Sequence, residues 1–294
     1  MKRLNDSRPA AVGALVAITF IWGVTFVLIK SAIRHIPPLE FLSIRFLIAS
    51  LLLTALVPRS FKEAIRVPRF VIPVGAALAA GYAFQTIGLV TTGATKSSLI
   101  TGMFVVVTPL FGAVALRAFP KPVVAVGAFI AAAGLFLLTT GPDTTFNRGD
   151  AITLFVPFAF AVHILLMGRY ARRVSPAALA LGQMAVAFIL LTAASVLSEA
   201  LVVPRGAEVW IALLVTSVGA SALAFVVMAW AQRVLSPTQA AVVCTMEPVF
   251  ATACGVVVLS ERLSVVGWAG AALIVGATLL VSIGEPETSG AEPV

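Results

Sequence analysis

The sequence predicts an all-α membrane protein in which ten transmembrane helices form two inverted five-helix repeats around a central cavity. Hydrophobic residues fill 60% of the chain and charged residues only 11%, against about 25% charged in soluble proteins, so few side chains can face water. The stretch FIWGVTFVLIK from Phe20 resembles FAFAVHILLMGRY, which begins 138 residues later at Phe158. Each half also holds a proline deep in an apolar segment, Pro109 or Pro248, and such matched breaks indicate the binding site of a transporter.

Ten apolar runs are long enough to cross a hydrocarbon core of about 30 Å, which takes about 20 helical residues. In the first half they lie, in order, at Ala10–Ile33, Pro38–Val57, Phe70–Val90, Ser97–Phe119 and Pro122–Thr140. In the second half they lie at Asp150–Tyr170, Pro176–Glu199, Glu208–Gln232, Ser236–Leu259 and Leu263–Ile283. The runs are apolar on all faces, which favours helices over the alternating strands of about ten residues that build an outer-membrane barrel.

These spans divide the chain into a first repeat at residues 10–140 and a second at 150–283, joined by a linker at 141–149. Residues 1–9 and 284–294 are expected to form cytoplasmic tails, of which the second is acidic and disordered. The start MKRLNDSR resembles that of a signal peptide, but the apolar run behind it is too long, so it is expected to stay as the first span.

The distribution of Lys and Arg predicts that both termini are cytoplasmic. With the N-terminus inside, inner segments hold thirteen of these residues and outer loops hold six. Each half has an odd number of spans, so the second half starts from the opposite side and the repeats are inverted. The net charge of +8 follows from this topology, and no nucleic-acid partner is expected. Cys244 and Cys254 are about 15 Å apart along one predicted helix, too far for a disulfide.

One face of the first span is expected to meet the cavity. Its members share helical spacing and are Trp22, Thr25, Phe26 and Ile29. The repeat offset carries this face to Phe160, His163, Ile164 and Met167. We interpret Phe26, Ile29 and Ile164 as packing residues. Trp22 and His163 are expected at the cavity, since histidine is costly within a membrane, although a core histidine with a satisfied hydrogen bond is the alternative.

Polar stripes on the third and fourth spans extend this prediction. Their members are Tyr82, Gln85, Thr86, Ser97, Thr101 and Thr108. Pro109 leaves the carbonyl of Val105 without its helical donor, and Pro248 does the same to Cys244. For any single hydroxyl the alternative is a hydrogen bond that joins two helices.

Two charged residues are predicted inside spans. Glu247 must be paired, protonated or solvated, because a charge at mid-span costs about 2.5–3.5 kcal/mol. It is either a site for a substrate amine or a proton, or a structural carboxylate. Arg45 has Gln183 at its repeat position and no polar stripe on its own span, so we interpret it as a structural ion pair or carbonyl clamp, with a substrate carboxylate as the alternative.

A set of motifs spread over essentially the whole chain resembles the drug/metabolite transporter superfamily, and its EamA-type ten-helix exporters in particular. The motifs are Trp22-Gly23 with Lys30, Pro38 and Arg45, then Pro109, then Glu247-Pro248 followed by LSERLSVVGWAGAALIVGATLL. The nearest resemblance is to YddG-like bacterial amino-acid exporters. It implies an inner-membrane carrier whose helices 1, 3, 4, 6, 8 and 9 surround the cavity, with helices 5 and 10 at the periphery. The eighth span then adds Ser221 and Trp230.

The expected function is therefore export of amino acids and similar small amphipathic metabolites by alternating access. The expected substrate-binding residues are Trp22, Thr25, Tyr82, Gln85, Thr101, His163, Ser221, Trp230 and Glu247, with Pro109 and Pro248 as hinges. Drugs or other metabolites are the alternative substrates. A sugar-phosphate or nucleotide-sugar antiporter is a further alternative, but it would need cations in its cavity.

The sequence predicts no catalytic residue, no cofactor and no metal. It has no GxxxxGK[ST] motif and no metal-ligand spacing, and His35 lies far from His163. A membrane-embedded enzyme is disfavoured for this reason, and a channel because no selectivity filter or charged ring is visible. Coupling to protons through His163 or Glu247 and facilitated diffusion both stay open, and no oligomeric state is predicted.

Overall fold

The computed structural model describes residues 8–116, 119–138, 146–198, 201–259 and 264–283, and their regular structure is entirely helical. The first half contains α1 (Arg8–Ala32), α2 (Pro38–Leu56), α3 (Pro58–Arg66), α4 (Pro68–Leu89), α5 (Ala94–Gly102), α6 (Phe104–Leu116) and α7 (Pro122–Leu138). The second half contains α8 (Arg148–Thr153), α9 (Val156–Tyr170), α10 (Pro176–Ser198), α11 (Ala207–Ser217), the π-helix η2 (Val218–Leu223), α12 (Ala224–Ala231), α13 (Pro237–Cys244), α14 (Met246–Leu259) and α15 (Val265–Ile283). The all-helical prediction is confirmed for these residues.

Among the described residues, seven helical stretches are long and apolar enough to cross a membrane, and α7 and α15 are shorter apolar helices. Large apolar side chains point outward from the bundle, among them Val114, Phe129 and Leu197, which are 81%, 76% and 87% exposed. A soluble protein rarely exposes so continuous an apolar surface, whereas lipid solvates it well. The outer surface of the bundle is therefore suited to a bilayer.

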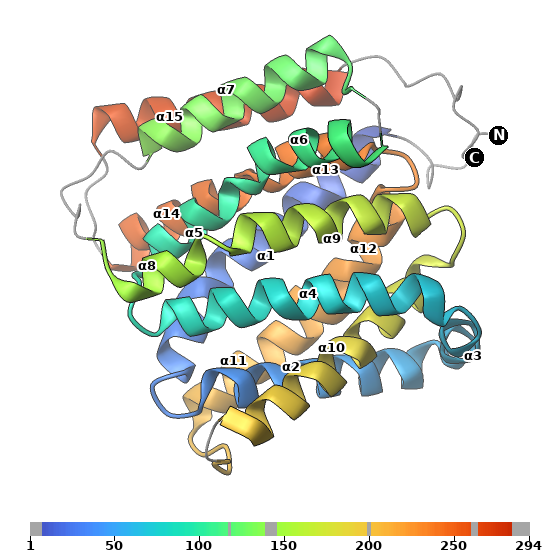
Figure 1. Ribbon diagram of the computed structural model, residues 1–294. Helices are drawn as coiled ribbons and strands as arrows, with labels where there is room; N and C mark the ends of the chain where they lie inside the picture. Colours follow the sequence, from blue (N-terminus) through green and yellow to red (C-terminus); the bar gives the residue numbers. More distant parts are fainter. Residues whose placement is uncertain (1–7, 117–118, 139–145, 199–200, 260–263, 284–294) are drawn as a thin grey trace.

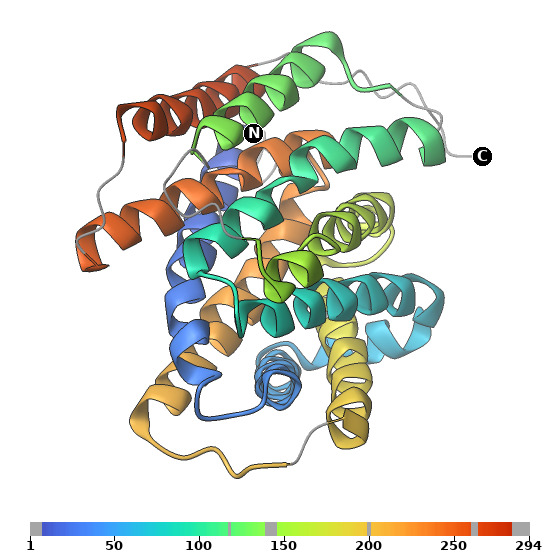
Figure 2. The same ribbon diagram turned by 60° about the vertical axis from the view of Figure 1, so that its left-hand side comes forward.

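The helices pack in layers around α1 and α12 (Figure 1). The pair α7 and α15 forms an outer layer at one end of the stack, where it packs on α6, α13 and α14 (Figures 1 and 2). A Cβ atom on Gly134 of α7 would lie 2.7 Å from the carbonyl oxygen of Gly270 in α15, so glycine lets these two backbones approach closely. The opposite end of the stack is built from α2, α10 and α11.

Several predicted spans are interrupted. The fourth breaks at Met103 between α5 and α6, the sixth at residues 154–155 between α8 and α9, and the ninth at Thr245 between α13 and α14. The last break directly follows Cys244. The carbonyl of Cys244 has no helical donor, because Pro248, four residues later, lacks a backbone N–H. Both α6 and α14 continue through their prolines, but the break before α6 comes six residues ahead of Pro109, in the turn before the freed carbonyl of Val105.

The basic loop after the second span contains a helix that the apolar pattern did not predict, α3. It exposes Phe61 and Ile65, and its Glu63 accepts hydrogen bonds from the backbone nitrogen and hydroxyl of Ser175, at 2.8 and 2.6 Å. The helix has too few hydrophobic residues to be predicted as a transmembrane span. The helix attaches the first half of the chain to the start of α10.

Candidate functional site

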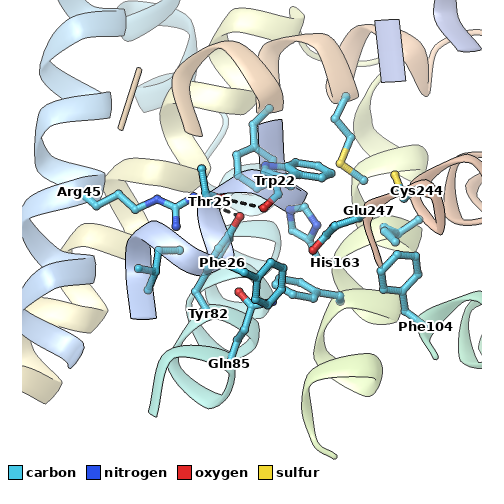
Figure 3. Close-up of a pocket in the computed structure, with 15 residues that line it drawn as sticks. Trp22, Thr25, Phe26, Arg45, Tyr82, Gln85, Phe104, His163, Cys244 and Glu247 are labelled. Atoms are coloured by element: carbon cyan, nitrogen blue, oxygen red, sulfur yellow. Dashed lines mark hydrogen bonds between the residues drawn. The ribbon is translucent and has the colours of Figure 1, made fainter. Parts of the chain in front are cut away.

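A cavity of about 50 Å³ lies at the centre of the bundle, where both halves meet (Figure 3). From the first half it is lined by Trp22, Thr25, Phe26, Ile29, Arg45, Tyr82, Gln85 and Phe104. From the second half it is lined by Phe160, His163, Ile164, Phe225, Met228, Cys244 and Glu247. Helices α1, α2, α4, α6, α9, α12, α13 and α14 therefore all contribute, and both predicted helical faces meet here.

Aromatic rings form much of the wall. The ring of Tyr82 lies 5.3 Å from that of Phe160 and 6.3 Å from that of Phe225, edge to face. Trp22 packs against Phe225 at 5.6 Å, and its indole nitrogen donates to the carbonyl oxygen of Ala220 at 2.9 Å. Rings held at both edge and face have little freedom to move. They present apolar surface and π-electron density that suit a hydrocarbon side chain or an ammonium group.

Gly23 sets the distance between α1 and α14 at this depth. A Cβ atom there would lie 2.8 Å from the backbone nitrogen of Ala251 and 2.8 Å from the carbonyl oxygen of Glu247. Only glycine admits so close an approach of two helix backbones. The contact brings the neighbouring Trp22 and Glu247 to the same part of the cavity.

Glu247 lines the cavity and is only 7% exposed. Within the described ranges its carboxylate forms no hydrogen bond and no ion pair. Its position follows from the helix break, since Glu247 is in the first turn of α14 directly after Thr245. The carboxylate therefore keeps its acceptor sites for protons or for a bound cation.

His163 also lines the cavity and is 1% exposed. Its Nε2 atom shares a hydrogen bond of 2.7 Å with Oε1 of Gln183, and its ring lies 5.6 Å from that of Phe225. The cavity histidine and the core histidine with a satisfied hydrogen bond, given above as alternatives, are thus not exclusive. It has a satisfied partner, and it borders the cavity.

Arg45 is a cavity residue that was absent from the predicted site. It is 1% exposed, and its Nε donates to the hydroxyl of Ser221 at 2.8 Å. One terminal nitrogen, Nη2, donates to the Tyr82 hydroxyl at 3.3 Å and to the carbonyl oxygen of Ala220 at 3.2 Å. The carbonyl clamp is present, but no described carboxylate lies within ion-pairing distance, and Nη1 has no hydrogen-bond partner.

The partners of Arg45 explain why sequence reasoning missed it. They come from α4 and from η2, not from its own helix, which shows no polar stripe. The wide turn of η2 turns the Ala220 carbonyl toward both Arg45 and Trp22. A usable signal was present nonetheless, since a charge within an apolar span is a candidate functional residue by itself.

Five predicted residues lie outside the cavity lining. Thr101 is behind the wall and accepts a hydrogen bond of 3.2 Å from Gln85, and Ser221 is the partner of Arg45 described above. Trp230 is partly buried and packs against the hydrophobic core. Pro109 and Pro248 belong to the broken helices α6 and α14 and do not border the cavity. Thr25 is in the lining, but its hydroxyl donates to the carbonyl oxygen of Trp22 at 2.8 Å.

No group of three or more His, Cys, Asp or Glu side chains within the described ranges could hold a metal ion. The chemistry available at the cavity is therefore that of Arg45, Glu247, His163 and neutral polar groups. These groups can recognise charge and donate or accept hydrogen bonds.

Comparison with known proteins agrees with this architecture. Residues 10–140 and 147–283 each match the EamA-like transporter family. A relative described as an uncharacterized transporter of Archaeoglobus fulgidus is 33% identical over 271 residues, which cover 92% of this chain and 84% of the relative. The uncharacterized inner membrane transporter YedA of Escherichia coli K12 is 28% identical over 282 residues, 93% of this chain and 90% of that protein.

A solved structure titled "Crystal structure of protein" resembles the fold with a TM-score of 0.76, over 94% of this chain and 98% of that one. Its sequence is 21% identical, so it supports the fold alone. Both halves of the chain match one family, and full-length relatives are named transporters. The chain is a multi-pass membrane transporter, and it belongs to the EamA-like transporter family.

Proposed function

We propose that this transporter exports amino acids and similar small amphipathic metabolites by alternating access. The observation that carries the proposal is the aromatic cavity at the meeting point of both halves, with the unpaired carboxylate of Glu247 in its wall. An ammonium group would meet Glu247, and an apolar side chain would pack against the rings. No bond of the substrate is broken, so no catalytic step is part of the proposal.

The proposed architecture is ten spans in two inverted repeats with both termini in the cytoplasm. In support, equivalent helices of the two halves lie against each other, as they would near a two-fold axis. The equivalent spans in contact are the second with the seventh (α2 with α10), the fourth with the ninth (α5 with α14 and α6 with α13) and the fifth with the tenth (α7 with α15). The proposed orientation rests on the excess of Lys and Arg in the inner segments.

Alternating access is supported by the compact cavity and by polar contacts at both ends of the bundle. The central cavity is compact, with a volume of about 50 Å³. Polar contacts hold both ends of the bundle: Lys96 pairs with Asp150 at 2.6 Å at the proposed outer end, and Arg172 donates to the Arg233 carbonyl oxygen at 3.1 Å at the inner end. We propose that these contacts hold both ends closed in an occluded form, so that loading requires one end to open.

The test is uptake of radiolabelled amino acids into proteoliposomes that contain the purified protein. Each labelled amino acid is competed with unlabelled amino acids, cationic drugs and sugar phosphates. Saturable uptake that other amino acids inhibit is the expected result. Uptake of a drug or a sugar phosphate without amino-acid uptake would retain the transporter and overturn the substrate class.

A further inference from the structure

We infer that Arg45 binds a substrate carboxylate while Glu247 receives the ammonium group, so that the cavity selects zwitterions. This inference rests on the proposed function and narrows its substrate class. It assigns a binding role to Arg45, whose structural hydrogen bonds use only some of its donors.

The guanidinium of Arg45 is a buried charge, and no carboxylate of the described residues forms an ion pair with it. All of its hydrogen-bond partners are neutral: the Ser221 hydroxyl, the Tyr82 hydroxyl and the Ala220 carbonyl oxygen. Dipoles stabilise a cation only in part when water is excluded, so the positive charge is incompletely compensated. Its Nη1 atom, moreover, is fully buried and makes no hydrogen bond. Native proteins rarely leave such a donor unused, and those that do often reserve it for a ligand.

The geometry fixes this guanidinium toward the cavity. Its central carbon lies 4.5 Å from the ring centre of Tyr82 and 5.4 Å from that of Phe46. Figure 3 shows the side chain reaching from α2 toward the other lining residues. Nε and Nη2 are engaged, so Nη1 is the donor left for a bound group, and because it is buried in this form a substrate reaches it only when the packing around it opens. A rigid, planar donor that cannot lose its proton suits a carboxylate better than a lysine would.

Glu247 supplies the opposite charge from the other side of the cavity. In the view of Figure 3, Arg45 and Glu247 enter from opposite sides of the labelled residues, and Glu247 belongs to α14. The two residues form no ion pair with each other. A zwitterion would compensate both charges at once, whereas an amine would leave Arg45 unpaired and a simple carboxylate would leave Glu247 unpaired. A phosphate dianion would also be repelled by Glu247 when that residue is ionised.

The second half carries no equivalent charge. Gln183 occupies the repeat position of Arg45, 138 residues later, and shares its hydrogen bond with His163. The anion site is therefore confined to the α2 side of the cavity. This asymmetry would bind the substrate in one orientation, with its carboxylate toward α2 and its ammonium toward α14.

Four compounds with the same branched side chain test the inference: leucine, leucinamide, 3-methylbutylamine and 4-methylpentanoate. Each competes with labelled leucine for uptake into proteoliposomes that hold the full chain. A lost charge-assisted hydrogen bond corresponds to about tenfold to hundredfold weaker binding, so leucine should compete at least about tenfold better than the three analogues. Equal competition by leucinamide would overturn the role of Arg45 and leave amino-acid export intact.

Variants of Arg45 test whether this residue causes the preference for leucine over leucinamide. Arg45→Gln should bring leucine and leucinamide toward equal potency, and Arg45→Lys should restore part of the preference. A purely structural arginine would lower uptake without changing this ratio, and that result would contradict the inference. The matched control is Arg69→Gln, since Arg69 also lies over an aromatic ring, Phe70 at 4.7 Å, but is exposed and remote from the cavity.

If Arg45→Gln does not fold, the analogue series on the unmodified protein and on Arg45→Lys decides the question. If the unmodified protein moves no amino acid but moves an amine drug, the proposed function fails, and this inference fails with it. The two failures are thus distinguishable by the first experiment on the unmodified chain.

Discussion

Glu247 is held almost completely away from solvent without a compensating ion pair among the described residues. A charge at mid-span costs about 2.5–3.5 kcal/mol on insertion scales, and the chain gains nothing in packing from a carboxylate there. The fold brings it beside Trp22 through the close approach at Gly23. A residue that costs stability and borders a cavity is best explained by what it binds.

The first prediction concerns this carboxylate. Glu247→Gln keeps the shape and the hydrogen-bonding capacity of the side chain but removes its charge. We expect transport to be abolished while the protein still folds, since an ammonium group or a proton then has no acceptor of the right charge. Uptake into proteoliposomes measures transport, and size-exclusion chromatography with circular dichroism measures folding. Normal uptake by a folded Glu247→Gln protein would contradict the role of Glu247 in binding the substrate or a proton.

Part of the site could be predicted from the sequence, through helical spacing and through the free-energy cost of a polar side chain within a membrane. The helical spacing of Trp22 and Thr25, and the cost of a buried His163, are local properties that the sequence displays. The sequence did not place Arg45 in the site, because its hydrogen-bond partners come from α4 and η2, and only tertiary packing brings them to it. Thr101 was placed in the site for its polarity, but it is outside the cavity lining and accepts a hydrogen bond from Gln85, which is in the lining.

At the scale of helices, the site depends on close approaches and on breaks. Helices α1 and α14 meet at Gly23, and the breaks before α6 and α14 put Phe104 and Glu247 at cavity depth. The apolar runs predicted where helices lie, since length and composition alone set that signal. They did not predict the break at Met103 or the π-helix η2. Gly102 stands directly before that break and Gly219 lies within η2, but a single glycine in an apolar run does not separate a break from ordinary helix.

The second prediction tests the packing of α1 on α14. Gly23→Ala places a methyl group within 2.9 Å of backbone atoms of α14 and of the Phe250 Cβ, none of which can move cheaply. Overpacking of this kind costs about 1–3 kcal/mol, so the thermal unfolding midpoint in detergent should fall. The matched control is Gly13→Ala in the same helix, where nothing lies within 4 Å. An equal midpoint for both variants would contradict the tight contact.

The third prediction tests the proposed outer closure. Asp150 is fully buried and accepts from Lys96 at 2.6 Å, from Thr92 at 2.9 Å and from the backbone nitrogen of Asn147 at 2.9 Å. Asp150→Asn weakens charge-assisted hydrogen bonds worth about 1.5–3 kcal/mol each. We expect lower thermal stability and easier opening of this end, measured as faster thiol labelling of a cysteine placed at Phe104.

An exposed ion pair supplies the control for that experiment. His35 and Glu208 lie 3.8 Å apart with side chains 58% and 69% exposed, so solvent screens their interaction. Glu208→Gln should leave stability and labelling close to those of the unmodified protein. If Asp150→Asn behaves like Glu208→Gln, the Lys96 contact does not hold the outer end closed.

On the scale of the whole molecule, two matching halves enclose one cavity that neither half could form alone. The all-helical fold and its membrane setting were predictable, because composition and repeat spacing are global properties of the chain. The volume of the cavity and the contacts at its two ends were not, because they depend on how the halves dock. Those contacts underlie the proposal of an occluded state.

The fourth prediction tests the proposed topology with an impermeant thiol reagent on intact cells. In a background of Cys254→Ser, with Cys244 buried, a cysteine at the exposed Arg205 should be labelled from outside. A cysteine at the exposed Lys62 in α3 should be labelled only after the cells are permeabilised. The reverse pattern would place both termini outside.

Counterflow is the measurement that tests the central claim most directly. Proteoliposomes loaded with unlabelled leucine are diluted into a trace of labelled leucine, and the label inside is followed with time. A carrier with one occluded site should accumulate label transiently above its equilibrium level, and Glu247→Gln should abolish this overshoot. Entry of label without an overshoot would indicate a channel, and no entry of any amino acid would contradict amino-acid export.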